Sequence, residues 1–123
     1  MLKECLENID VRNDTPFKNS GIILFSNADK RQYYITFGSD DLYSLYDAEE
    51  VESIKANGND GYITIEVDLF DDDGYCEENY NGGRMFYRHD KYSGFINDYE
   101  LIKEALKAIG CSNADDCFVL NKF

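Results

Sequence analysis

The pattern of apolar and polar positions predicts short helices and strands that follow one another along the chain. A first helix is indicated by four apolar residues at helical spacing, Leu2, Cys5, Leu6 and Ile9. It must end before residues 13–16, where Pro16 disfavours helix in the residue before it. The apolar run 22–25 and the aromatic, β-branched run 33–37 predict two strands. The turn-forming residues 27–30 separate them, so we expect a hairpin.

The middle of the chain predicts a helix followed by a long strand. Asp47, with Glu50 three residues later, has the spacing of a capping box, and residues 57–61 would end the helix. Its apolar stripe is narrow and consists of Ala48, Val51 and Ile54. Residues 62–70 alternate strictly, with Ile63, Ile65, Val67 and Leu69 on one face and Thr64, Glu66, Asp68 and Phe70 on the other. We therefore expect the acidic residues of this strand to lie on its outer face.

The last third of the chain predicts two further strands around one strongly amphipathic helix. A tight turn at residues 81–83 leads into a strand at 85–87, which residues 93–96 would extend. Asn97 is the expected N-cap of the helix, with Glu100 at its third position. The apolar face of the helix consists of Leu101, Ile102, Ala105, Leu106 and Ile109, and Gly110 suits the position after its end. Residues 118–120 form a final strand.

Together these elements predict one α+β domain over residues 1–123. The sheet is expected to be mainly antiparallel, with four to five strands and two or three helices in the order (α)ββαββαβ. A chain of 123 residues with 43% hydrophobic residues is large enough to form a core without disulfides or metals.

Composition also indicates the compartment. The sequence contains no apolar run long enough for a membrane span or a signal peptide. Its four cysteines, Cys5, Cys76, Cys111 and Cys117, are scattered, so we expect reduced thiols with only an incidental packing role. The predicted location is the cytoplasm, of a bacterial host cell if a mobile element encodes the protein, and no membrane partner is expected.

The charge distribution is the most unusual property of the sequence. The net charge is −13, yet residues 1–39 and 79–123 are each neutral. Residues 40–78 contain fourteen acidic residues and one base, Lys55. From this segment we predict a partner-binding surface made of Asp40, Asp41, Glu49, Glu52, Glu66, Asp68, Asp71, Asp72, Asp73, Tyr75, Glu77 and Glu78. The alternative is a solvated acidic face that only keeps the protein soluble.

No metal site or catalytic centre is predicted. An EF-hand loop with Gly74 at its sixth position would need acidic residues where Leu69 and Tyr80 stand. The cysteine spacings do not match zinc sites, and His89, the only histidine, lacks the partners of a catalytic triad. We expect no enzymatic activity and no cofactor. Loose binding of a divalent cation by the carboxylates of residues 71–78 is an open alternative.

A short basic stretch lies close to His89 in the sequence. It contains Arg84, Arg88 and Lys91, which we expect to pair with Glu66 and Asp68 across neighbouring strands. Direct binding of nucleic acid is not expected, because the negative field of the whole protein repels phosphates.

The charge map favours an inhibitory binding protein. DNA carries about one charge per 1.7 Å of axis, and a dense carboxylate surface can occupy the basic groove that holds nucleic acid. In size and charge only, the chain is similar to phage and mobile-element antagonists of restriction or CRISPR nucleases, and to immunity proteins that neutralise nuclease toxins. The expected partner is a basic protein, a nuclease or another nucleic-acid-binding protein. The alternatives are such an immunity protein, a divalent-metal or small-ligand domain, and a scaffold or oligomerisation domain.

Overall fold

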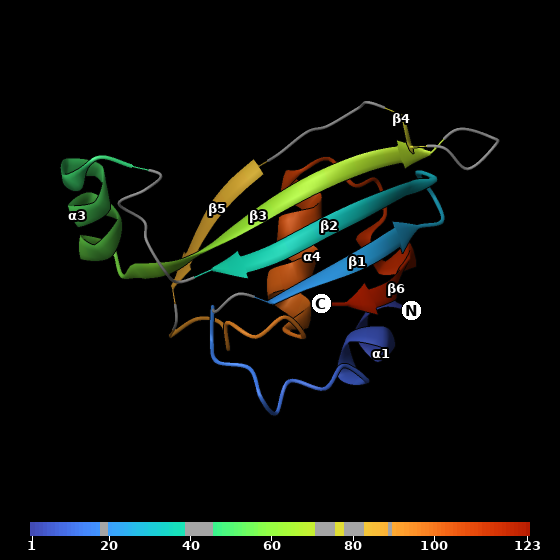
Figure 1. Ribbon diagram of the computed structural model, residues 1–123, viewed down its shortest axis with the longest axis horizontal. Coiled ribbons are helices and arrows are strands. Elements are labelled where there is room, and N and C mark those ends of the chain that lie inside the picture. The colour runs from blue at the N-terminus through green and yellow to red at the C-terminus, as the bar shows by residue number, and fades with distance from the viewer. Residues whose placement is uncertain (18–19, 39–45, 71–75, 78–82, 89) are drawn as a thin grey trace.

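The computed structural model describes residues 1–17, 20–38, 46–70, 76–77, 83–88 and 90–123. Its elements, in chain order, are α1 (Leu2–Glu7), β1 (Ser20–Ser26), β2 (Arg31–Gly38), α3 (Ala48–Ala56), β3 (Asn59–Phe70), β4 (Cys76–Glu77), β5 (Gly83–Arg88), α4 (Tyr99–Ala108), the 3-10 helix η1 (Ala114–Asp116) and β6 (Cys117–Lys122). Figure 1 shows their arrangement. The predicted α+β class and its mainly antiparallel sheet are confirmed.

The sheet is built around the hairpin of β1 and β2. Strand order is β4-β3-β2-β1-β6, and β5 also pairs with β3. Every pairing is antiparallel. The long strand β3 lies along β2 on one side, and its other side is shared by β5 near its start and β4 near its end.

Helix α4 packs on one face of the sheet and completes the core (Figure 1). Its side chains Leu101, Ile102, Ala105 and Leu106 are fully buried, and Ile109 packs partly against them. They meet Leu2 and Leu6 of α1 and the inward residues of the sheet, Ile22, Leu24, Tyr33, Ile35, Phe37 and Ile63. Burial of each large apolar side chain contributes about 1.5–3 kcal/mol, so this layer stabilises the fold. The predicted burial of the apolar face of the last helix against the sheet is confirmed. Of the β3 residues expected to join it, Ile63 is buried, and the side chains of Ile65, Val67 and Leu69 lie outside the description.

Two predictions for the segment before α4 are wrong. Residues 93–96 do not extend β5, because Gly94 has a φ of +76° and its carbonyl accepts a hydrogen bond from the Phe17 amide at 2.8 Å. A Cβ at Gly94 would lie 2.5 Å from the Phe17 ring, so glycine allows this close approach. The N-cap is Asp98 and not Asn97, since Asp98 accepts from the Leu101 amide at 3.1 Å and from the Ser93 amide at 2.8 Å.

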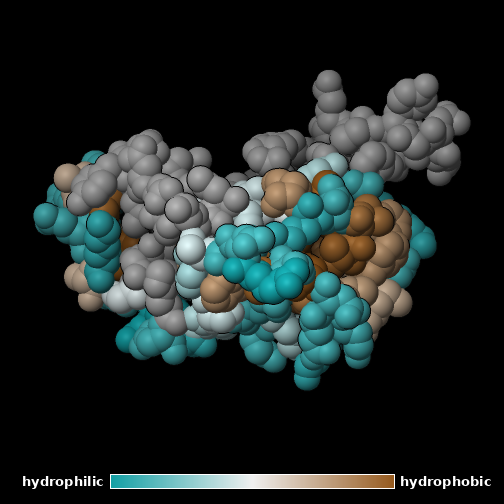
Figure 2. All heavy atoms as spheres, turned by 60° about the horizontal axis from the view of Figure 1, so that its bottom comes forward, coloured by the Kyte–Doolittle hydropathy of each residue, from teal (hydrophilic) through white to brown (hydrophobic). Residues whose placement is uncertain are grey.

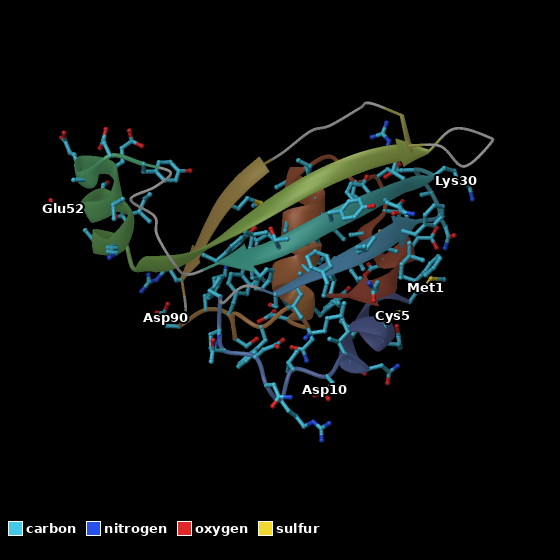
Figure 3. The ribbon with its side chains drawn as sticks, viewed as in Figure 1. Met1, Cys5, Asp10, Lys30, Glu52 and Asp90 are labelled. Atoms are coloured by element: carbon cyan, nitrogen blue, oxygen red, sulfur yellow. The ribbon has the colours of Figure 1, made fainter. Side chains whose placement is uncertain are left out.

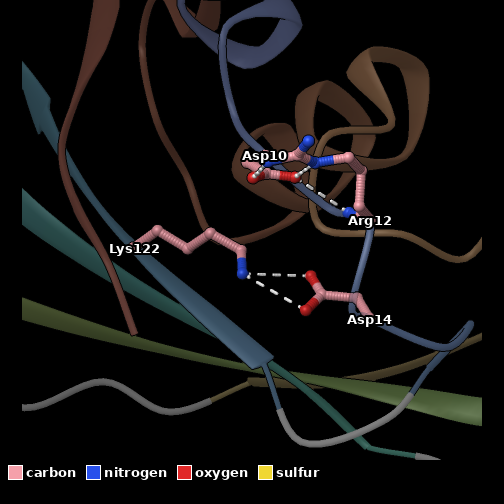
Figure 4. A network of polar contacts seen from close by, with 4 residues as sticks. All are labelled: Asp10, Arg12, Asp14 and Lys122. Atoms are coloured by element: carbon pink, nitrogen blue, oxygen red, sulfur yellow. Dashed lines mark hydrogen bonds and ion pairs between the residues drawn. The ribbon is translucent and has the colours of Figure 1, made fainter.

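The N-terminal loop is joined to β6 by the least exposed ion pair among the described residues (Figure 4). Lys122 Nζ donates to Asp14 Oδ1 at 3.3 Å and lies 3.1 Å from Oδ2, without hydrogen-bond geometry to that second oxygen. The neighbouring pair of Asp10 and Arg12 is exposed, with its closest contact at 2.7 Å. In the described part of the chain, no helix is both long and apolar enough to cross a membrane.

Candidate functional site

Helix α3 carries the described part of the predicted acidic surface. Asp47 begins the helix as its N-cap and accepts a hydrogen bond from the Glu50 amide at 2.8 Å, as the capping-box spacing predicted. Four acidic residues of this helix are exposed, and we call them the α3 acidic surface: Asp47, Glu49, Glu50 and Glu52. Glu52 lies at the opposite end of the molecule from Met1, Cys5 and Lys30 (Figure 3).

The inner side of α3 is narrower than the sequence suggested. Val51 is fully buried and Ile54 half-buried, whereas Ala48 is exposed and does not belong to the apolar stripe. Val51 is not part of the main core cluster. Asn57 and Gly58, with a φ of +81°, end the helix and lead directly into β3. Among the described residues, Val51 is therefore the one fully buried side chain of this helix, and the acidic side chains of the helix are exposed.

Neighbouring carboxylates of α3 influence the pKa of Glu50. The pKa of Glu50 is raised, first by the negative charge of Asp47, then by desolvation and by the hydrogen bond to Asp47, with Glu49 adding to the effect. Five residue steps separate Asp47 from Glu52, which corresponds to about 7.5 Å of helix axis at 1.5 Å per residue. Four negative charges over this length have a mean axial spacing of about 2.5 Å, which lies between the values of about 1.7 Å for both DNA strands together and about 3.4 Å for one strand.

The structure places the other predicted surface residues only in part. Glu66 and Asp68 pair with Tyr34 and Gln32 of β2, and Glu77 of β4 pairs with Leu69, but the side chains of these three acidic residues lie outside the description. The remaining members lie outside the described residues altogether: Asp40, Asp41, Asp71, Asp72, Asp73, Tyr75 and Glu78. Glu49 and Glu52 are thus brought together, and the structure adds their neighbours Asp47 and Glu50.

The predicted pairing of the basic stretch with Glu66 and Asp68 is wrong for Arg88. For Arg84 it stays a prediction, because the side chains of Arg84, Glu66 and Asp68 lie outside the description. In the register of β3 and β5, Arg84 lies opposite Thr64 and Arg88 opposite Asn59, so Glu66 and Asp68 lie beyond the end of this ladder. Arg88 instead binds the nearby Asp90 through two hydrogen bonds, at 3.1 and 2.9 Å. His89 lies outside the described residues.

Several acidic residues of the flanking segments are held by donors. The Arg12 guanidinium lowers the pKa of Asp10, and the Tyr99 hydroxyl lowers that of Asp115, which also lies 3.5 Å from Lys103. The two ends of the molecule differ in hydropathy as well. Figure 2 shows hydrophilic side chains around α3, at the left, and apolar atoms gathered toward the end that holds α1 and β6. On this face of the molecule, the side chains drawn around α3 are mainly hydrophilic.

A second group of polar and thiol side chains lies where the β1–β2 turn meets the segment between α4 and β6. The Sγ atoms of Cys111 and Cys117 are 3.8 Å apart, and both residues are buried. Asp29 lies beside them: one carboxylate oxygen accepts from the Ser112 amide at 3.0 Å and the Tyr33 hydroxyl at 3.1 Å, and the other from the Ser112 hydroxyl. We call Asp29, Tyr33, Cys111, Ser112 and Cys117 the Asp29 cluster.

The end of α4 brings the two cysteines together. The Gly110 amide donates to the Lys107 carbonyl at 3.1 Å, and the Cys111 amide donates to the Leu106 carbonyl at 3.0 Å. These two bonds define a Schellman motif, in which Gly110 takes a φ of +96° and the next residue turns back onto the helix. Cys111 therefore points inward, and η1 returns the chain to Cys117 at the start of β6.

The sequence alone predicts only an incidental packing role for these cysteines, because their spacing fits no zinc site. The available signal was positional: Cys111 directly follows a predicted helix-ending glycine, and Cys117 directly precedes a predicted strand. Among the described residues, no group of three or more potential ligands could hold a metal ion. Comparisons with protein families, curated proteins and solved structures found no match to this chain.

Proposed function

We propose that this protein binds a basic protein through the α3 acidic surface and thereby occupies a surface that the partner uses for nucleic acid. The observation that carries the proposal is the cluster of four exposed carboxylates on one short helix. Such a protein acts in the cytoplasm of a bacterial cell, as an antagonist of a CRISPR or restriction nuclease or as an immunity protein against a nuclease toxin. It needs neither a cofactor nor catalysis.

Charge density supports this mode of binding. The axial spacing of carboxylates along α3 lies between that of phosphates on both DNA strands together and that on one strand. Because Asp47 raises the pKa of Glu50, the negative charges of α3 repel one another when the protein is free. A basic partner would relieve this repulsion, and attraction between opposite charges would speed association at low salt.

Position on the fold also supports the proposal. The helix stands at one end of the molecule and is anchored by Val51, while the main core lies under α4. A partner can therefore contact the α3 acidic surface without disturbing the packing that holds the domain together.

Charge reversal on α3 is the direct test. The double variant Glu49→Lys and Glu52→Lys leaves the N-cap Asp47 and the buried Val51 in place. The wild-type and variant proteins are used to capture partners from a bacterial lysate at low and high salt, and captured nucleases are assayed for cleavage of DNA and RNA. We expect the wild type to capture and inhibit a basic nuclease in a salt-sensitive manner. The variant should bind at least about tenfold more weakly per productive change.

The matched control is the double variant Glu7→Lys and Glu100→Lys. Both residues are exposed on helices outside the acidic segment, and the change in net charge is identical. If both variants lose the same affinity, only net charge matters and the α3 site is wrong. If no basic nucleic-acid-binding protein is captured, the proposed partner class is wrong. The identity of the captured enzyme distinguishes a defence nuclease from a toxin.

A further inference from the structure

Cys111 and Cys117 form a dithiol pair in an enclosed but reachable position. Their Sγ atoms are 3.8 Å apart, within contact distance. Cys117 is fully buried, whereas Cys111 retains 7% of its surface. Cys111 is therefore the member that a small reagent meets first, and Cys117 lies directly behind it.

The surroundings lower the pKa of the Cys111 thiol and raise the pKa of the Cys117 thiol. A hydrogen bond with Cys117 is the main cause that lowers the pKa of Cys111 to about 7, with smaller contributions from the Asn113 backbone and Tyr33, against opposing effects of burial and Asp29. The same interaction, together with burial, raises the pKa of Cys117. The hydrogen bond with Cys117 therefore favours the thiolate of Cys111, which is the form that reacts with oxidants.

We propose that Cys111 and Cys117 are a redox modification site that closes to a reversible disulfide when a hydroperoxide reaches Cys111. The thiolate of Cys111 attacks one peroxide oxygen, so that an S–O bond forms and the O–O bond breaks, and the departing hydroxide takes up a proton to become water. The sulfur of Cys117 then attacks the sulfenic acid of Cys111. The S–S bond forms, the S–O bond breaks, and the hydroxyl leaves as water with the proton of Cys117.

The net reaction converts two thiols and one hydrogen peroxide into a disulfide and two waters. Hydrogen peroxide suits this site because it is small and neutral, whereas Asp29 disfavours approach of anionic disulfides. Closure requires the sulfurs to move from 3.8 Å to about 2.05 Å. The segment between them contains only Ser112, Asn113 and η1, and we expect a local adjustment of this short turn to bring the sulfurs together. A dithiol reductant reverses the reaction by thiol–disulfide exchange.

Peptide mapping of the full-length protein tests the proposal. The reduced protein is treated with equimolar hydrogen peroxide, free thiols are alkylated, and trypsin is added. Cleavage after Lys107 and Lys122 places both cysteines in one peptide, residues 108–122, and Cys5 in another. We expect peptide 108–122 to lose two hydrogen atoms and take up no alkyl group, and dithiothreitol to restore alkylation of both cysteines. Cys5 should remain fully alkylated.

Two variants distinguish oxidation of a specific pair, Cys111 and Cys117, from unspecific oxidation of thiols. In Cys117→Ala, Cys111 should yield a sulfenic acid that dimedone traps, and Cys111→Ala should leave Cys117 unmodified. Full alkylation of peptide 108–122 after peroxide treatment of the wild type would overturn the proposal. So would independent oxidation of both cysteines to sulfinic acids, or oxidation of Cys5 at the same rate.

Discussion

The α3 acidic surface and the Asp29 cluster show two opposite uses of a carboxylate. On α3, acidic residues face one another, and the charge of Asp47 raises the pKa of Glu50. In the cluster, the Ser112 hydroxyl and amide donate to Asp29 and lower its pKa. A carboxylate held by donors stabilises its own fold, whereas carboxylates that repel each other are available to a partner. The net charge of −13 alone does not distinguish the two.

The largest expected effect concerns the core that lies outside both regions. Leu106→Ala should lower the free energy of unfolding by about 2–5 kcal/mol, because Leu106 is fully buried under the sheet. Urea denaturation measures the loss. Val51→Ala is the matched change on α3, and we expect a smaller loss because Val51 lies outside the main core. Equal losses would mean that α3 is as integral to the fold as α4.

Asp29→Asn should remove the stabilising carboxylate of the cluster. We expect a loss of about 1–2 kcal/mol, toward the lower end for bonds to a charged group because Asp29 is partly exposed. Since the pKa of Asp29 is lowered on folding, its contribution is fully present above the unfolded pKa of about 3.9 and disappears as the pH falls through the lower folded pKa.

Denaturation curves of the wild type and Asp29→Asn at neutral and acidic pH measure this dependence. The difference between the two proteins should shrink in acid. A difference that is constant with pH would show that the carboxylate charge of Asp29 has no part in the stabilisation.

Gly110→Ala tests the turn that positions Cys111. No atom lies within 4 Å of the added Cβ, so the destabilisation comes from the φ of +96° alone. We expect a loss of about 1–2 kcal/mol in the free energy of unfolding. Gly110→Asn should cost less, because asparagine tolerates this conformation better. Thermal denaturation of both variants measures the difference. Equal losses would indicate that the left-handed turn is not the cause.

The smallest effect on stability is expected on α3 itself. Glu49→Gln with Glu52→Gln should leave the urea midpoint unchanged or slightly raised, because the change relieves repulsion and removes no buried contact. Glu7→Gln with Glu100→Gln is the matched pair outside the helix. A clear loss of stability specific to the α3 pair would assign these acidic residues a structural role and weaken the proposed function.

The predictable part of this molecule was the part that local chemistry controls. Alternation predicted β3, the capping-box spacing predicted the start of α3, and helical spacing predicted the buried face of α4. The segment 93–96 was mispredicted because its conformation depends on Phe17, far away in the sequence. The Asp29 cluster was missed for the same reason, since Ser112 and Asp29 are 83 positions apart. Helical spacing does place Glu49 and Glu52 together on α3.

The position of β6 has a consequence for the synthesis of this protein. Strand β1, near the beginning of the chain, has β2 on one side and β6 on the other, and Ile22 is paired with Lys122. A ribosome must therefore release residues 117–122 before β1 can complete its pairing and Lys122 can reach Asp14. Until then, the edge of β1 in the nascent hairpin is unpaired. Chaperones can bind such an exposed edge during synthesis.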